Sequence, residues 1–378
     1  MNLAILGFES LGRKLYEILI AKKSEIYRNY DVNIKYILVD EIPDIALLPN
    51  NITNDYKKII DDSEIDLIID VLNSDKSFEY IKEALYSSKH VITSNYDVIS
   101  KHYVELQAIA IDMNVKLLFS GTLGCGMPVI FSLLSSYSYD EIIKIEAIFD
   151  SDINYLLTSM YKNNISYQQA KDNIINELNI KELDIEGKIQ AKKLQIISML
   201  AFNTTINYDD IYRYSIENID SDIILVANLL GYRIKYVSSA YYNQSAINMT
   251  VEPVLVKNTD VFANTDNRYG IIRYSGMNTS EKAFYGKNDK EVVADSIISD
   301  IRLVLSDFRQ KFMPRYSHIV NGNRHFVSKY LIKPKVMNDY FRSIQEKNLD
   351  KIIVSIPMKG EDILEHKNEI QFYARIID

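Results

Sequence analysis

The amino-acid sequence predicts an α/β fold, with a doubly wound parallel sheet followed by two regions of α+β character. Apolar strand-like runs alternate with helix-like runs through roughly the first third of the chain, which is typical of a parallel sheet with helices on both faces. A glycine-containing turn, Gly7 to Gly12, joins the first strand-like run to the first helix-like run. A glycine-rich segment at 121–128 ends this pattern, and longer strands and helices follow without internal repeats.

The individual elements follow from hydrophobic periodicity and turn residues. In the first region we predict strands at 3–6, 34–39, 67–71, 90–93 and 115–119, and helices at 13–21, 78–86, 98–113 and 129–135. In the second we predict strands at 142–149, 234–238, 251–256 and 269–274, and helices at 167–178, 185–199, 223–230 and 292–311. The last region reads as strands at 326–332, 351–356 and 371–376 with a helix at 336–345.

These patterns predict three domains. They are a Rossmann-type dinucleotide-binding domain at 1–135, an α+β domain at 136–312, and a small α+β domain at 320–378. We expect the helix at 292–311 to return to the first domain.

Composition excludes several classes of protein. The 378 residues are 47% hydrophobic and 25% charged, which is ordinary for a globular protein. A formal charge of −8 gives no general attraction to nucleic acid or to anionic membranes. No apolar run approaches the ~20 residues that span a bilayer, and no signal peptide is visible. A single cysteine, Cys125, excludes an intrachain disulfide and predicts a reducing, cytoplasmic location. We expect Cys125 to be buried and inert.

The turn Gly7-Phe8-Glu9-Ser10-Leu11-Gly12 occupies the place where a dinucleotide-binding fold has its G-x-G-x-x-G sequence. We therefore predict that Gly7, Phe8, Leu11 and Gly12 contact a cofactor. Glu9 replaces the middle glycine, which normally lets the backbone approach a pyrophosphate. Like charges ~4 Å apart cost roughly 1 kcal/mol in water and about 4 kcal/mol at an effective dielectric constant of 20. The turn thus predicts a cofactor site and contains one residue that opposes it.

Asp40 ends the second predicted strand, where an acidic residue binds the ribose hydroxyls of NAD. Asp40 and Glu41 disfavour the 2′-phosphate of NADP, so the sequence favours NAD. The alternative, that Asp40 is an ordinary acid at a strand end, is equally open.

Taken in order, six segments resemble the homoserine dehydrogenase family. The segments are Gly7–Gly12, Lys89–Asn95, Gly121–Pro128, Asn154–Thr158, Asp184–Leu194 and Gly231–Lys235. The resemblance extends from residue 1 to about residue 305, and the last region is similar to the ACT regulatory domain that many members append. It implies a Rossmann-type fold, NAD(P), and interconversion of aspartate 4-semialdehyde and homoserine in threonine and methionine biosynthesis. It also implies a small-molecule substrate, a homodimer, and a catalytic and dimerisation role for the domain at 136–312.

The resemblance assigns roles to particular residues. Lys193 falls on the catalytic lysine, which gives a proton to the substrate oxygen or takes one from it. Asp184 falls on a substrate-contacting aspartate. Other matched positions are Asn154 and Gly126 for substrate and Asn95, Gly124 and Gly286 for cofactor. Simpler alternatives stay open: Lys193 as a solvated helix lysine, Asn95 as a turn residue, and the Gly124–Gly126 turn as a purely conformational element.

Residues that perform chemistry depart from the family pattern. Ile189 replaces a second aspartate one helical turn before Lys193, and Tyr96 replaces a lysine. Ser120 replaces a glutamate, which argues against the family's monovalent-cation site, and we predict no other metal. Acidic residues enter the substrate loop at 150–154, and the late cofactor loop at 285–290 keeps one glycine of three.

Three hypotheses follow from these departures. We favour an active NAD(P)-dependent oxidoreductase of the homoserine dehydrogenase type. The alternatives are a weakened homologue that binds a metabolite or acts as a regulatory partner, and an oxidoreductase that acts on another small substrate.

Overall fold

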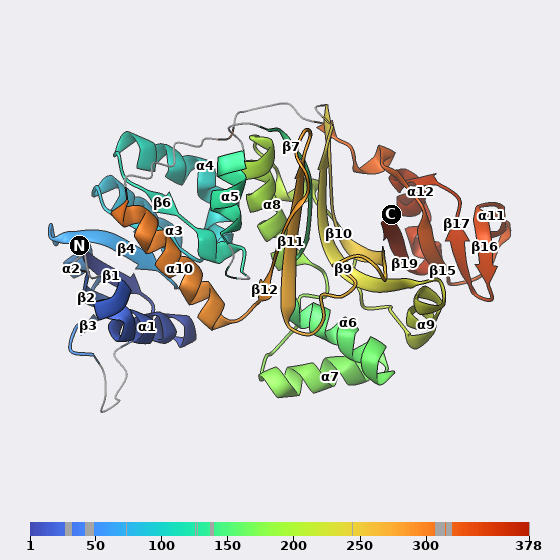
Figure 1. Cartoon of the computed structure of the whole chain (residues 1–378), viewed down its shortest axis with the longest axis horizontal. Coiled ribbons are helices and arrows are strands. Elements are labelled where there is room, and N and C mark those ends of the chain that lie inside the picture. The colour runs from blue at the N-terminus through green and yellow to red at the C-terminus, as the bar shows by residue number, and fades with distance from the viewer. Residues whose placement is uncertain are drawn as a thin grey trace. The chain divides into compact units, whose positions relative to one another are not determined.

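Figure 1 shows the computed structural model of the chain. The structure describes residues 1–26, 32–41, 49–72, 74–124, 126, 128–136, 140–243, 245–306, 314 and 320–377, so Cys125 lies outside the described residues. The chain forms two compact units, one made of Met1–Phe131 with Asn288–Arg315, the other of Ser132–Lys287 with Tyr316–Asp378. Each unit is described by itself below.

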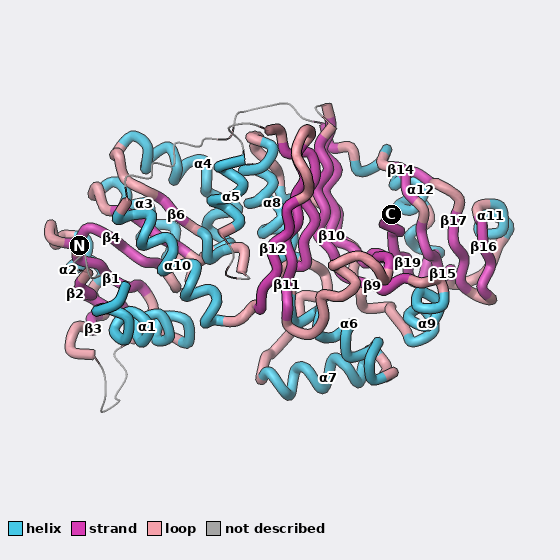
Figure 2. Tube along the Cα trace, viewed as in Figure 1, coloured by secondary structure: helices cyan, strands magenta, loops and turns pink. Residues whose placement is uncertain are grey.

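The first unit is built on a parallel sheet (Figure 2). Its strands within the described residues are β1 (Asn2–Leu6), β2 (Asn33–Leu38), β3 (Ile52–Thr53), β4 (Ile65–Asp70), β5 (His90–Thr93) and β6 (Leu117–Leu118). Every pair is parallel, in the order β3-β2-β1-β4-β5-β6. This is the strand order of the Rossmann fold, so the predicted fold class is confirmed.

Helices complete the first unit. They are α1 (Ser10–Ile26), α2 (Tyr56–Ile60), α3 (Ser77–Tyr86), α4 (Tyr96–Asp112) and α10 (Lys290–Leu305), with the short 3₁₀ helix η1 (Ser120–Thr122). Helix α5 (Val129–Ser136) begins in this unit. Helix α10 packs against α1 and contributes Ala294, Ile297 and Ile301 to the same apolar core as Leu3 and Ile5 of β1. A segment distant in sequence therefore closes the core of the first unit.

The turn after β1 is tight because of its two glycines. Gly7 has a φ of 103°, a conformation that costs glycine little. A Cβ atom on Gly12 would lie 2.1 Å from the carbonyl oxygen of Gly7, so only glycine lets α1 approach the turn this closely. Glu9 is not among the described residues with positive φ. The fold therefore tolerates a side chain at the middle position without backbone strain.

The second unit contains a large mixed sheet of β12-β11-β7-β9-β10-β19-β15-β17-β16, with β8 and β13 paired beside β10. The strands are β7 (Ile142–Ile148), β8 (Tyr212–Arg213), β9 (Tyr232–Tyr242), β10 (Ala246–Lys257), β11 (Tyr269–Gly276), β12 (Lys282–Lys287), β13 (Val320–Asn321), β15 (Tyr330–Pro334), β16 (Gln345–Leu349), β17 (Ile352–Ser355) and β19 (Ile370–Ile377). A separate short pair joins β14 (Val327–Ser328) to β18 (Met358–Lys359).

The helices of the second unit are α6 (Ser151–Asn163), α7 (Tyr167–Leu178), α8 (Lys188–Phe202), α9 (Ser221–Leu229), α11 (Asp339–Ser343) and α12 (Gly360–Glu365), with 3₁₀ helices η2 (Tyr208–Asp210), η3 (Asn323–His325) and η4 (Lys367–Glu369). Helix α7 has the predicted bounds because a capping box, Ser166 with Gln169, fixes its start. Helix α8 begins three residues later than predicted, since the Asp184–Gly187 turn precedes it and Gly187 has a φ of 69°.

Three expectations for this unit were wrong. Helix α6 forms where we predicted no helix, and its N-cap is Asp150. Strand β12 forms across part of the expected late cofactor loop, and Gly286 pairs there with Gly270 of β11. The helix expected at 336–345 is shorter than predicted: only α11 forms there, and Gln345 already begins β16.

In the last region, the α-helices and the strands of the large sheet follow the order β15-α11-β16-β17-α12-β19, and the strands are arranged β19-β15-β17-β16. This is a ferredoxin-like βαββαβ arrangement, and its assignment as an ACT domain stays a prediction. Strand β19 also pairs in parallel with β10, so the last region shares a sheet with the rest of the second unit. The division into three domains likewise stays a prediction.

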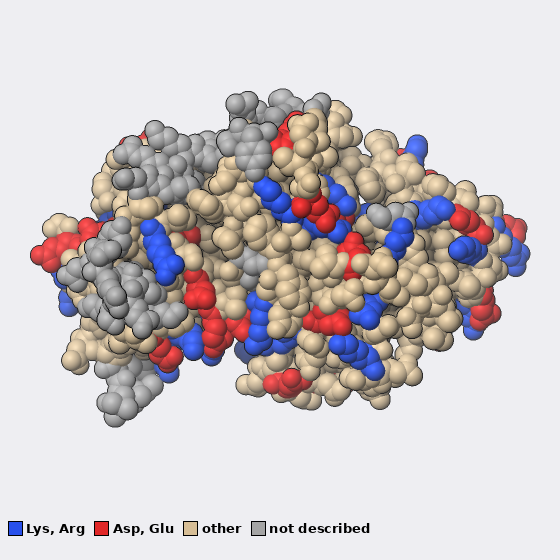
Figure 3. Space-filling model, in the orientation of Figure 1, with Lys and Arg blue, Asp and Glu red and all other residues tan. Residues whose placement is uncertain are grey.

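Charged side chains are interspersed on the face drawn in Figure 3, where the described residues form no continuous basic area. Within the described residues, no helix is both long enough and apolar enough to cross a membrane.

Candidate active site

The first unit has a pocket of about 730 Å³ beside the Gly7–Gly12 turn. Gly7, Phe8, Asp40, Val71 and Leu72 all line it, and they follow strands β1, β2 and β4. In open parallel sheets ligands bind outside these carboxyl ends, and phosphates bind at the N-terminus of the first helix. Helix α1 begins at Ser10, which also lines the pocket. The position of the pocket therefore fits a dinucleotide.

The charges around this pocket are mixed. Its lining includes three basic side chains, Arg13, Lys14 and Lys290, and five acidic ones, Glu9, Glu17, Asp40, Glu41 and Glu291. The basic side chains lie near the turn. Arg13 Nε donates to the carbonyl oxygen of Phe8 at 3.1 Å, and Lys290 Nζ donates to Ser10 Oγ at 3.2 Å. They would offset part of the repulsion between the exposed Glu9 and a pyrophosphate at this turn. Sequence reasoning missed all three, although Arg13 and Lys14 directly follow the turn.

Asp40 lies at the mouth of the pocket with its side chain exposed, and its Oδ1 accepts from Lys76 Nζ at 3.1 Å. An exposed ion pair of this kind is worth only about 0–1 kcal/mol. The carboxylate can therefore exchange Lys76 for ribose hydroxyl groups at little cost.

The remaining predicted cofactor residues of this unit have structural positions. Leu11 and Gly12 lie in the first turn of α1 but do not line the pocket. Asn95 is the N-cap of α4, and its Oδ1 accepts from the amides of Asp97 and Val98 at 3.0 and 3.1 Å. This is the turn role that the sequence left open.

The positions of Gly124 and Gly126 leave no room for a side chain. Their φ values are 74° and 56°. A Cβ atom on Gly124 would lie 2.8 Å from Asn288 Oδ1, and one on Gly126 would lie 2.0 Å from Val292 Cγ1. These glycines thus allow the loop to approach the start of α10. Their contact with cofactor or substrate stays a prediction.

Replacing Glu9 is expected to tighten cofactor binding. The Glu9→Gly variant should bind NAD⁺ more tightly by ~1–3 kcal/mol, or about 5- to 150-fold in Kd, because a like charge leaves the pyrophosphate site. Titration calorimetry on the whole chain would measure this. Glu9→Gln separates charge from bulk, and Glu17→Gln, which alters another acid of the same pocket, is the matched control. Equal affinities for the wild type and both Glu9 variants would mean that Glu9 points away from the phosphates.

The second unit brings together Asp150, Asp184 and Lys193. Lys193 is half-buried on α8. Asp184 accepts from the amides of Lys188 and Ile189 at 2.8 and 2.7 Å and so holds the start of this helix. Asp150 caps α6 through its Oδ1, which accepts from the amides of Asp152 and Ile153 at 2.8 and 3.0 Å. Asp150 therefore interacts electrostatically with both Lys193 and Asp184.

Electrostatic interactions couple these three side chains. Burial raises the pKa of Asp150 to about 6, the amide of Ile153 lowers it, Asp152 and Asp184 raise it, and the positive charge of Lys193 lowers it. Asp150 is therefore a carboxylate that titrates near neutral pH beside Lys193. Sequence reasoning treated Asp150 only as a source of repulsion, although an aspartate followed by Ser151 and Asp152 is a helix N-cap signal.

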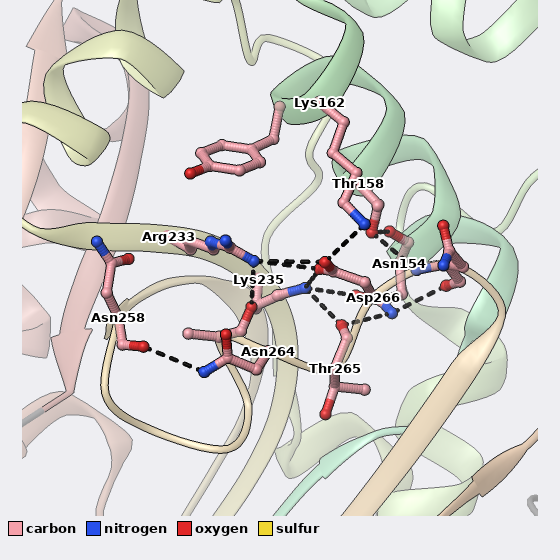
Figure 4. A network of polar contacts seen from close by, with 12 residues as sticks. Asn154, Thr158, Lys162, Arg233, Lys235, Asn258, Asn264, Thr265 and Asp266 are labelled. Carbon is pink, nitrogen blue, oxygen red and sulfur yellow. Dashed lines mark hydrogen bonds and ion pairs between the residues drawn. The ribbon is translucent and has the colours of Figure 1, made fainter.

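Asn154 is buried in a polar network, and its predicted contact with substrate stays a prediction. It is 1% exposed, and Nδ2 donates to the carbonyl oxygens of Thr265, Asn267 and Tyr269 at 2.9, 3.0 and 3.1 Å. Its Oδ1 accepts from Lys235 Nζ at 3.1 Å (Figure 4). Direct contact with a substrate would require this network to open.

Figure 4 shows that Lys235 lies at the centre of this network. Its ammonium donates to the carbonyl oxygen of Thr265 at 2.6 Å and lies 3.3 Å from Asp266 Oδ1. Burial lowers the pKa of Lys235 to about 8, and Asp266 acts in the opposite direction. The network ties α6 to β9 and to the loop before β11, which fixes the position of the Asp150 cap.

No group of three or more His, Cys, Asp or Glu residues arranged for a metal ion occurs within the described part of the chain. Ser120 donates through its amide and hydroxyl to the buried Asp300 at 2.9 and 2.6 Å, and burial raises the pKa of Asp300 to about 7. Gly286 lies in β12 and does not line the nucleotide pocket.

The fold defines a protein of the Rossmann class, in which the parallel-sheet unit is joined to a second unit built on a mixed sheet. Residues 128–302 match the family model described as homoserine dehydrogenase. The chain is 26% identical over 320 residues to a homoserine dehydrogenase of Bacillus subtilis. This alignment covers 82% of this chain and 74% of the relative.

Solved structures agree with this match. A homoserine dehydrogenase from Thiobacillus denitrificans has a TM-score of 0.89 at 20% identity, covering 100% of this chain and 98% of that one. A hyperthermophilic archaeal homoserine dehydrogenase in complex with NADPH has a TM-score of 0.67 at 21% identity, covering 82% and 98%. These structural likenesses establish the fold. The sequence matches confirm the resemblance to homoserine dehydrogenases.

Proposed function

We propose that this chain is an NAD(P)-dependent homoserine dehydrogenase that interconverts aspartate 4-semialdehyde and homoserine. The observation that supports this most directly is the group formed by Lys193, Asp150 and Asp184 in the unit that follows the nucleotide-binding unit. Proton transfer to a substrate oxygen by a positioned side chain is the chemistry that this group can perform.

Different residues of the chain orient the cofactor and transfer the proton. A bound nicotinamide cofactor supplies or accepts the hydride. The turn at 7–12 and Asp40 orient that cofactor, and we favour NAD because Asp40 lies at the mouth of the pocket. Lys193 gives a proton to the substrate oxygen during reduction and removes it during oxidation. We also propose that the protein works as a homodimer, as the family resemblance implies.

Asp150 and Asp184 act on Lys193 in place of the family's second aspartate, whose position is occupied by Ile189. The position one turn before Lys193 on α8 is Ile189, so no carboxylate of that turn faces the lysine. Asp150 and Asp184 come instead from the starts of α6 and α8. A carboxylate about 4 Å from an ammonium favours the charged form by roughly 1–4 kcal/mol. The lysine therefore becomes a better proton acceptor when Asp150 is ionised.

The acids of the substrate loop repel a substrate carboxylate less than the sequence suggested. Arg268 Nε donates to Asp152 Oδ1 at 2.9 Å, so the charge of Asp152 is paired. This ion pair is half-buried and leaves Asp150 as the loop acid that faces Lys193. An amino-acid substrate therefore meets less negative charge than residues 150–154 suggest when read alone.

The test is homoserine-dependent reduction of NAD⁺ and NADP⁺ by the purified chain, measured from about pH 5 to 10 with K⁺ or Na⁺ supplied. We expect turnover that falls as the pH drops below about 6. Protonated Asp150 no longer stabilises the ammonium that Lys193 forms when it takes the proton of the substrate hydroxyl. The Asp150→Asn variant should lose this acid limb and run about tenfold slower at neutral pH.

Two results would count against the proposal. Absence of homoserine turnover with either cofactor, in protein that binds NAD⁺, would point to a different small substrate. An unchanged acid limb in Asp150→Asn would assign that ionisation to another group.

A further inference from the structure

A buried carboxylate lies at the carboxyl end of β4, beside the nucleotide pocket of the first unit. Asp70 is the last residue of β4, and the next two residues, Val71 and Leu72, line the pocket. A Cβ atom on Gly7 would lie 3.1 Å from the carbonyl oxygen of Val71, so this segment packs directly on the turn after β1. Asp70 itself is fully buried and does not line the pocket. Its carboxylate therefore lies behind the pocket wall that Val71 and Leu72 form.

Three uncharged groups hold the Asp70 carboxylate. Oδ2 accepts from Thr93 Oγ1 at 2.7 Å, and Oδ1 accepts from Ser77 Oγ at 3.1 Å and from the amide of Leu72 at 3.2 Å. Within the residues that the structure describes, no ion pair includes Asp70. The titratable side chain that interacts with it electrostatically is Tyr56 of α2, a phenol that stays neutral because burial raises its pKa. The negative charge of Asp70 is thus held in place but not cancelled.

The ionised form of Asp70 lowers the stability of the fold. Burial raises the pKa of Asp70 to about 6, and the hydroxyls of Thr93 and Ser77 and the amide of Leu72 offset only part of this rise. Because the folded value lies above the ordinary value of 3.8, the free energy of unfolding falls as the pH rises from about 4 to about 6. At neutral pH the carboxyl is nevertheless ionised. A perturbed carboxyl of this kind beside a pocket points to a role other than stability.

The strand order determines which half of a dinucleotide faces Asp70. Asp40, after β2, is placed to meet the ribose of the adenosine half, and the turn at 7–12 after β1 is placed to receive the pyrophosphate. Strand β4 is the neighbour of β1 on the side opposite to β2. The nicotinamide half of the cofactor therefore extends toward the end of β4. The oxidised nicotinamide ring carries a positive charge, which it loses when it accepts a hydride.

We propose that the buried Asp70 carboxylate makes this pocket favour the oxidised cofactor over the reduced one. An uncompensated negative charge attracts the cationic nicotinamide ring and has no comparable attraction for the neutral, reduced ring. The interaction crosses the protein wall at Val71 and Leu72, where a charge acts more strongly than it does across water. Asp70 does not touch the ring in this role and is not a catalytic residue. The inference rests on binding of a nicotinamide cofactor to this pocket, as proposed above.

The test is titration of the full chain with NAD⁺ and, separately, with NADH, and again with NADP⁺ and NADPH. At about pH 8 we expect Asp70→Asn to weaken binding of the oxidised form by about five- to twentyfold and to leave that of the reduced form within about twofold. A change in pocket shape would weaken both forms alike, so the ratio of the two dissociation constants separates charge from structure. In the wild type this ratio should shift in the same direction as the pH falls below about 6, because Asp70 takes up a proton. Thermal unfolding at about pH 8 should show that Asp70→Asn is no less stable than the wild type.

Asp66→Asn is the matched control, since Asp66 is an exposed aspartate of the same strand whose Oδ2 accepts from the amide of Asn2 at 2.8 Å. This variant should bind both forms of the cofactor as the wild type does. An unchanged ratio in Asp70→Asn, in protein that binds both forms, would overturn this inference alone, and so would an equal shift in Asp66→Asn. A wild type that binds neither form at millimolar concentration would contradict the proposed function, and the role of Asp70 with it.

Discussion

The Lys193→Ala variant is expected to lose homoserine turnover by about 10²- to 10⁴-fold in kcat, the usual contribution of a positioned proton-transfer group. Cofactor affinity should not change, because Lys193 belongs to the second unit and does not line the nucleotide pocket. Steady-state kinetics and a separate NAD⁺ titration would distinguish loss of chemistry from loss of binding.

Lys192→Ala is the matched control for this variant, since Lys192 is the neighbouring half-buried lysine of α8. Its kcat should stay within a few fold of the wild type. If Lys192→Ala loses turnover and Lys193→Ala does not, the alignment of the catalytic lysine is shifted by one residue. If both variants keep full activity, neither lysine handles the proton.

The second large effect is expected on stability. Arg375 of β19 and Glu252 of β10 form a buried ion pair, with Nε and Oε1 2.6 Å apart and side chains 4% and 3% exposed. Arg375→Met leaves the Glu252 carboxylate buried without its partner. Breaking a pair of this kind costs about 3–5 kcal/mol, and urea unfolding of the second unit should show a loss of this size.

The double variant Arg375→Met with Glu252→Met tests the cause. It removes both charges, so most of the lost stability should return. Arg342→Met, which breaks an exposed pair with Asp339, should change the free energy of unfolding by less than about 1 kcal/mol. A double variant no more stable than Arg375→Met alone would show that packing, rather than charge, explains the loss.

The parts of the fold that the sequence predicted are governed by local signals. The turn between β1 and α1 depends on glycines five residues apart, and its geometry at Gly7 and Gly12 is the expected one. Helix α7 was predicted with its bounds from its apolar spacing, and the capping box that fixes its start, Ser166 with Gln169, is also local in sequence. Strands of the parallel sheet read as short apolar runs, since both faces of such a sheet are buried.

The parts that the sequence did not predict depend on distant partners. Gly286 was assigned to a loop by its glycine pattern, yet pairing with β11 makes it part of a strand. The hydrogen bonds of Asn154 with Lys235 and Thr265, which are distant in sequence, were not predicted. The group of Asp150, Asp184 and Lys193 likewise forms only when α6 and α8 pack in the same unit, so no sequence spacing indicates it.

The parallel pairing of β19 with β10, at Val254 with Arg375 and Val256 with Ile377, has a consequence for how the chain is made. Strand β10 is synthesised long before β19, and until β19 arrives one edge of β10 lacks this neighbour. Exposed strand edges invite pairing with other chains. We therefore expect the second unit to finish folding only late in translation, and a chain that stops before β19 to aggregate rather than to persist as a shorter enzyme.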